Sequence, residues 1–120
     1  MINLLLVGLG GACGSMLRYV LSVQLVFSQE GFPFHTLTVN VLGALLIGVL
    51  SALSLKHGLD YRLVLFLQMG VLGGFTTFST FALETVNLLN GGKYGLAILY
   101  VLLSLVLSLG AVIIAHVLIK

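Results

Sequence analysis

Charged residues are scarce in this sequence. Asp, Glu, Lys and Arg make up 7% of its 120 residues, whereas 60% are hydrophobic. A soluble domain carries roughly 25% charged residues, and this composition leaves too little polar surface to face water on all sides. An ordinary soluble domain is therefore excluded, and we expect the outer surface of the protein to contact lipid.

Several other residue types are rare, and each shortage excludes a class of site. Cys13 is the single cysteine, so an intrachain disulfide is excluded. The three histidines have no metal-ligand spacing, and the sequence has no visible Ser/His/Asp or Cys/His arrangement, so we expect no enzyme. The formal charge of +2 forms no basic patch, which argues against nucleic-acid binding.

Long apolar stretches, by contrast, are abundant. Each is long enough to cross a bilayer, which takes about 20 residues, and backbone groups in lipid must be satisfied internally, so we expect helices. The first stretch has no Lys or Arg before it, unlike a secretory signal, and we interpret it as a retained span. Residues 1–120 are therefore predicted to form one all-α transmembrane domain of four helices. The expected spans are 3–27, 36–55, 61–89 and 95–119.

The connecting segments carry few charges. The segment 28–35 holds the only proline and is predicted to be a loop. Lys56, Arg62 and Lys120 are expected on the same side of the membrane as the N-terminus, and Lys93 on the other. This positive-inside signal is weak. The chain can therefore insert either way, which permits an antiparallel, dual-topology dimer without establishing one.

Glycines recur in the spans. Gly10 and Gly14 form a GxxxG step in the first span, and Gly73 and Gly74 are adjacent in the third. Small residues let helix backbones approach closely in lipid. The pattern therefore predicts tight helix packing.

The middle of the third span reads GGFTTFSTF at residues 73–81. Two glycines followed by hydroxyl and β-branched residues form a poor helix, so we expect this span to be broken mid-membrane. Non-helical backbone at that depth persists only when it is buried in protein or lines a cavity. Freed carbonyls can bind a cation and freed N–H groups can face an anion. The alternative is a hydroxyl-rich kink that neighbouring helices satisfy.

Three further side chains near this break suit an anion. Phe78 and Phe81 are three residues apart and share one helical face, and an aromatic ring has a positive edge. The amide of Asn40, which shares a face with Gly43, can donate a hydrogen bond. The alternatives are ordinary core or lipid-facing packing for the rings and an interhelical hydrogen bond for Asn40.

The fourth span carries one polar stripe. Tyr100, Ser104 and Ser108 recur every four residues in an otherwise apolar helix. A single serine in such a helix usually bonds to the carbonyl four residues back. Three hydroxyls in register favour a hydrated track.

Apart from Arg62 at the start of the third span, two charges lie within the predicted spans. Arg18 is near the middle of the first span, where a charge is expensive and functional by default. It either attracts anions or anchors a helix end, and the anchoring role is favoured. Glu84 lies near the end of the third span. It either lines a vestibule or reaches the membrane interface.

Three segments complete the sequence evidence. They read GGACGSMLRY at residues 10–19, TLTVNVLG at residues 36–43 and GVLGGFTTFSTF at residues 70–81. Together they resemble the three signatures of the CrcB/Fluc family of fluoride channels, and the third is highly specific. The resemblance covers essentially the whole chain, including its length and number of spans.

The resemblance implies a channel of the bacterial inner membrane that lets fluoride leave the cytoplasm passively, and so confers fluoride resistance. It also implies an antiparallel homodimer with two pores. The residues that match the family's pore are Asn40, Phe78 and Phe81, and those that match its polar track are Tyr100, Ser104 and Ser108. The backbone carbonyls of Gly73 and Thr76 match a structural sodium site shared by both subunits at the dimer centre.

The main alternative is a small multidrug-resistance exporter, which also has four spans and a similar length. Such exporters use a Glu in the first span and aromatic residues that include Trp. This sequence has no Glu in its first span and no Trp. A membrane scaffold without transport activity is a third class. It has no need of the broken span or the polar stripe.

Overall fold

The computed structural model describes residues 1–24 and 31–120, and this part of the chain forms four apolar helices long enough to cross a membrane. The third of these, Tyr61–Asn90, is divided into several elements. The predicted end of the first span at residue 27 and residues 28–30 of the predicted loop 28–35 lie outside the described residues. The elements are α1 (Ile2–Gln24), α2 (Phe34–His57), α3 (Tyr61–Val64), η1 (Leu65–Leu72), α4 (Gly73–Phe75), α5 (Phe78–Asn90) and α6 (Tyr94–Ile119).

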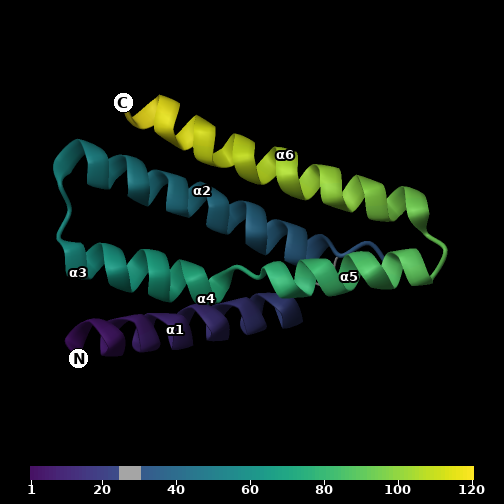
Figure 1. Ribbon diagram of the computed structural model, residues 1–120, viewed down its shortest axis with the longest axis horizontal. Helices are drawn as coiled ribbons and strands as arrows, with labels where there is room; N and C mark the ends of the chain where they lie inside the picture. The colour runs from purple at the N-terminus through teal and green to yellow at the C-terminus, as the bar shows by residue number, and fades with distance from the viewer. Residues whose placement is uncertain (25–30) are drawn as a thin grey trace.

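The helices lie roughly along one direction, and both termini are at the same end of the molecule (Figure 1). The helix α2 lies between α6 and the divided third span. The helix α1 packs against η1 and α4, which belong to the first half of that span, whereas α6 contacts α5 in the second half. Both halves of the third span contact α2, but their other neighbours differ.

The second span is longer than predicted. Helix α2 extends beyond the predicted 36–55 at both ends, so His35 and Lys56 are helical rather than part of the connections. It ends because Gly58 adopts a left-handed conformation (φ 65°, ψ 59°) and donates its N–H to the Ser54 carbonyl oxygen. The next helix begins at once, because Asp60 accepts the backbone N–H of Arg62 through its side chain.

The break in the third span is confirmed, but the two glycines are not part of it. Gly73 is helical (φ −62°, ψ −39°), and the chain becomes extended only at Thr76 (φ −86°, ψ 158°) and Thr77 (φ −149°, ψ 116°). The thin segment between α4 and α5 in Figure 1 is this break. The two threonines, rather than the glycines before them, therefore interrupt the helix.

The glycines are needed for close contact with α1. A Cβ atom on Gly74 would lie 2.5 Å from the Gly11 carbonyl oxygen, and one on Gly10 would lie 2.8 Å from the Gly70 Cα atom. A Cβ atom on Gly14 would overlap the Val71 carbonyl oxygen. The tight packing predicted from the glycine pattern is thus confirmed between the first and third spans.

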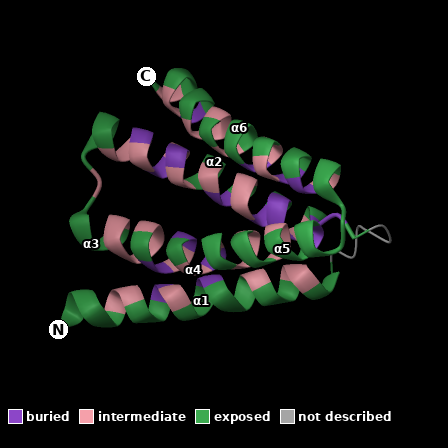
Figure 2. Ribbon diagram, turned by 45° about the vertical axis from the view of Figure 1, so that its right-hand side comes forward, coloured by how far each residue is buried: buried purple, intermediate pink, exposed green. Residues whose placement is uncertain are grey.

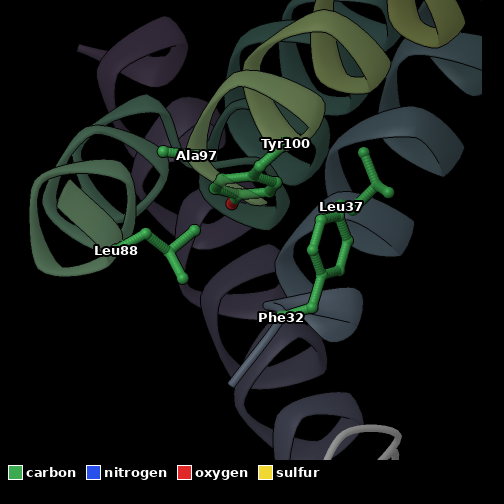
Figure 3. Packing of buried hydrophobic residues seen from close by; sticks show 5 residues of the cluster. All are labelled: Phe32, Leu37, Leu88, Ala97 and Tyr100. Atoms are coloured by element: carbon green, nitrogen blue, oxygen red, sulfur yellow. The ribbon is translucent and has the colours of Figure 1, made fainter. Parts of the chain in front are cut away.

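A small apolar core joins α2, α5 and α6 near the end where α5 turns into α6. It consists of Phe32, Leu37, Leu88, Ala97 and Tyr100 (Figure 3). The Phe32 and Tyr100 rings meet edge-on, with centroids 5.6 Å apart. Elsewhere the outward faces of the helices are exposed along their whole length (Figure 2), and many of these exposed side chains are large and apolar. Such a surface requires lipid or another chain to cover it.

Candidate functional site

The break is held by one side chain from α2. Asn40 donates from Nδ2 to the Thr77 carbonyl oxygen at 3.0 Å and accepts the Thr77 N–H at Oδ1 over 2.8 Å. Both backbone groups of Thr77 are therefore satisfied at membrane depth, as non-helical backbone requires. Of the two alternatives for Asn40, the structure contains the interhelical hydrogen bond. The amide still has a second Nδ2 hydrogen to offer.

The second half-helix begins with a side-chain cap. The Thr77 hydroxyl oxygen accepts the Thr80 N–H at 3.2 Å and donates to the Thr80 hydroxyl oxygen at 3.1 Å. An N-terminal threonine of this kind satisfies one of the free N–H groups of a helix start. The hydroxyl-rich sequence thus ends one helix and starts the next within two residues.

This rearrangement releases two backbone carbonyls. In an unbroken helix the Thr77 N–H would bond to the Gly73 carbonyl, and the Thr80 N–H to the Thr76 carbonyl. Here those two N–H groups go to Asn40 and to the Thr77 hydroxyl. The Gly73 and Thr76 carbonyls therefore lack their regular helical donors.

Arg18 anchors the end of the first half-helix. Its Nε donates to the Gly74 carbonyl oxygen at 3.2 Å, a bond between residues 56 positions apart in sequence. A positive charge at a helix C-terminus interacts favourably with the helix dipole. Of the two roles considered for Arg18 from the sequence, this bond fits the anchoring one.

A groove of about 340 Å³ follows the break along α2, the third span and α6. Its walls are mostly apolar, and several polar side chains interrupt them at intervals. The Phe78 and Phe81 rings lie in the groove with their centroids 5.6 Å apart, so the two rings do share one face. The polar residues of the groove are Asn40, Gln68, Thr76, Thr77, Ser104 and Ser108.

Ser104 differs from the other polar residues of the groove in its burial. It is 8% exposed, and its hydroxyl has no hydrogen-bond partner among the described residues. A buried hydroxyl normally has a partner, and a helical serine usually finds one in the carbonyl four residues back. Ser104 does not bond in this way and instead lines the groove, where its hydroxyl is available to a bound ion or water.

Tyr100 does not line the groove, although it lies in register with Ser104 and Ser108. It is fully buried, and its hydroxyl donates to Glu84 Oε1 at 3.3 Å. The Phe81 ring lines the groove and contacts Tyr100, with the two ring centroids 5.1 Å apart. Glu84 also lines a separate cavity of about 350 Å³ with Lys93. The predicted stripe is therefore divided, with two serines in the groove and the tyrosine outside it, in contact with Phe81.

One polar residue of the groove was missed by sequence reasoning. Gln68 lines the groove together with Leu72 and Gly73 on the first half of the third span. It lies in η1, where the backbone bonds run to the fifth residue, and the Gly73 N–H donates to the Gln68 carbonyl oxygen. A glutamine inside an apolar span can be noticed in the sequence. The direction in which its side chain points, however, depends on this irregular turn.

Four apolar helices of membrane length around a polar mid-membrane break define a small multi-pass membrane protein of the transport type. Residues 5–116 match the family model described as "CrcB-like protein, Camphor Resistance (CrcB)". The chain belongs to this CrcB family.

Curated relatives agree over most of the chain. A protein of Thermus thermophilus is 54% identical over 106 residues, which are 88% of this chain and 85% of that protein. One from Ruminiclostridium cellulolyticum is 45% identical over 122 residues, covering 100% of this chain and 94% of its own length. One from Agrobacterium fabrum is 46% identical over 114 residues, or 93% and 91%. All three are named fluoride-specific ion channel FluC.

Proposed function

We propose that this chain is a subunit of a fluoride-selective channel through which fluoride leaves the cytoplasm passively. The names of its relatives support this function. The observation that carries it is the unpartnered Ser104 hydroxyl in a groove that also holds Asn40 and two phenylalanine rings.

The groove offers the chemistry that a small anion needs. Hydroxyl and amide groups donate hydrogen bonds to it, and the edges of the Phe78 and Phe81 rings attract it without binding it strongly. Conduction requires binding that is favourable enough to enter and weak enough to leave. We therefore assign Asn40, Phe78, Phe81, Ser104 and Ser108 to the ion path.

Tyr100 and Glu84 support one wall of this path without lining it. The Phe81 ring packs against Tyr100, whose hydroxyl is held by Glu84. The Tyr100–Glu84 pair therefore fixes the position of a ring that faces the ion. Glu84 also lies at the cavity beside Lys93, which fits the vestibule role considered for it from the sequence.

The functional unit is proposed to be an antiparallel homodimer. The groove is open on one side, and Phe78 is 78% exposed although it lies at the centre of the site. A second copy in the opposite orientation would cover this face and enclose the path. The weak charge bias between the two ends of the chain is compatible with insertion in both orientations.

A sodium ion is proposed at the centre of this dimer. Sodium is a hard cation, and such ions prefer oxygen ligands. The Gly73 and Thr76 carbonyls fit, because the break has removed their regular helical donors. One chain supplies only these two groups, so the same pair from the partner would complete the site. When bound, the cation lowers the cost of bringing an anion into a low-dielectric interior.

The proposed location is the inner membrane of a bacterium. Purified protein in liposomes loaded with potassium fluoride tests the function directly. Addition of a potassium ionophore should release fluoride to an ion-selective electrode, whereas liposomes loaded with potassium chloride should release little chloride. Absence of fluoride release from correctly assembled protein would overturn the proposal.

A further inference from the structure

We infer that Gln68 contacts the permeating anion and extends the polar lining of the groove beyond Ser108. This inference rests on the proposed function of the groove and adds a residue to it. Gln68 lies in the membrane-spanning part of the chain and is half-buried, and its side chain makes no hydrogen bond to the described residues. A carboxamide at membrane depth without a partner is costly, so its position calls for a ligand.

The irregular turn of η1 explains why Gln68 faces the groove. In an α-helix, residues 68 and 73 would lie about 140° apart around the axis, because successive residues are separated by about 100°. In η1 the Gly73 N–H bonds to the Gln68 carbonyl, five residues back, which brings the two residues toward one face. Gly73 and Gln68 accordingly line the same groove. Such turns are frequent at functional sites.

The order of residues places Gln68 at one end of the groove. The third span runs antiparallel to α2 and α6 (Figure 1), so the groove begins at Asn40 and Phe81 and continues toward the end that holds both termini. On α6 the lining continues from Ser104 to Ser108, and on the third span it continues past Gly73 to Gln68. Gln68 therefore supplies the last polar side chain on that wall.

The chemistry of a glutamine suits this position. Its amide nitrogen has two hydrogens to donate to an anion, and its long side chain can follow the ion. It carries no charge, so it cannot trap the ion as a lysine would. An ion that leaves the phenylalanine rings and the two serines thus meets a further donor before it reaches water.

The first test replaces Gln68 with methionine, which keeps an unbranched side chain but removes the donor. Fluoride efflux from liposomes should fall about tenfold, as expected for the loss of one hydrogen bond to a charged group. Met69→Leu is the matched control, because Met69 is the neighbouring residue, is 63% exposed and does not line the groove. Its flux should equal that of the wild type.

The second test asks whether water reaches position 68. Its result does not depend on small changes in packing around a substituted side chain. Gln68→Cys in a Cys13→Ala background should react with a water-soluble, charged thiosulfonate reagent, and the reaction should stop fluoride efflux. Met69→Cys in the same background should keep its efflux after the same treatment. This result would hold even if Gln68→Met failed to assemble.

The outcomes separate the inference from the function on which it rests. Wild-type protein without fluoride efflux would refute the proposed channel. Wild-type efflux together with normal flux in Gln68→Met and no effect of the reagent on Gln68→Cys would overturn the role of Gln68 alone. Reduced flux and block by the reagent would establish it.

Discussion

The carboxamide of Asn40 holds Thr77 by both of its backbone groups, with hydrogen bonds of 3.0 Å and 2.8 Å between residues that are 37 positions apart in sequence. The bond from the Thr77 N–H replaces the helical bond to Gly73 that the break has removed, and the bond to the Thr77 carbonyl adds a donor from another helix. The same side chain lies in the groove beside Phe78 and Phe81. Asn40 therefore supports the broken backbone and faces the proposed ion path at once.

Asn40→Asp should abolish fluoride flux. It brings a negative charge into the groove, and at an effective dielectric constant of about 20 its repulsion of an anion amounts to several kcal/mol. It also removes the donor to the Thr77 carbonyl, which should lower stability by about 1–3 kcal/mol. Liposome efflux and thermal gel filtration measure the two effects. Asn90→Asp, at the exposed end of α5, makes the same charge change away from the groove and should conduct normally. Wild-type flux in Asn40→Asp would contradict the assignment.

Phe81→Ile should lower fluoride flux by about tenfold, which corresponds to roughly 1.4 kcal/mol in the barrier. The substitution keeps apolar bulk but removes the aromatic ring, whose positive edge we assign to the ion path. Phe78→Ile should lower flux in a similar way, and it should do so with little loss of stability in the isolated chain because Phe78 is largely exposed there. Both variants are compared by efflux and by their gel-filtration profiles. If they run as the wild type and conduct as the wild type, the rings have no part in the path.

Gly14→Ala should destabilise the protein by about 1–3 kcal/mol or more, because the added methyl group overlaps the Val71 backbone between α1 and η1. Gly8→Ala is the matched control in the same helix. A Cβ atom on Gly8 meets nothing within 4 Å, so this change should be neutral or stabilise the helix by up to about 1 kcal/mol. Thermal unfolding in detergent distinguishes the two. Equal melting temperatures would show that α1 does not pack as described.

A cysteine label should reveal both orientations of the chain. Asn90 is exposed at the end of α5, and Asn90→Cys in a Cys13→Ala background should react with a membrane-impermeant reagent from either side of the membrane, in about equal parts. A position in the adjacent turn is less suitable, because Gly92 has a positive φ of 76° that a cysteine would strain. Reaction from one side only would exclude the antiparallel dimer.

An experimental structure of the dimer should contain a cation between the paired Gly73 and Thr76 carbonyls. The metal–oxygen distances should be shorter than the roughly 2.7–2.8 Å of a hydrogen bond to water. Crystals grown with thallium in place of sodium should show a strong anomalous signal at the same point. Density at water-like distances without such a signal would remove the sodium site.

The sequence predicts the four spans and the broken third span because apolar length and helix propensity are local properties. The exact position of the break is not local. Thr76 and Thr77 are extended because Asn40 satisfies Thr77, whereas Gly73 and Gly74 remain helical in the part of the span that packs against α1, where Gly74 meets Gly11. Propensity alone ranks glycine as the stronger helix breaker, which is why the glycine pair was wrongly included in the break.

The site shows the same division between local and non-local information. Phe78 and Phe81 share a face by their spacing alone, and the structure agrees. The register of Tyr100 with Ser104 does not reveal that Phe81 and Glu84 enclose the tyrosine, since both come from another helix. Gln68 was missed because its direction depends on the five-residue turn of η1, which leaves no periodic signal in the sequence.

The bond from Arg18 to Gly74 also constrains how the protein is made. Arg18 enters the membrane with the first span, but its acceptor is synthesised 56 residues later. A guanidinium group costs up to about 2.5–3.5 kcal/mol at the centre of a bilayer, and until Gly74 is made the nascent α1 lacks this acceptor for its own. We therefore expect the first span to gain this anchor only after the ribosome has completed the first half of the third, so that biosynthesis ties the beginning of the chain to its middle.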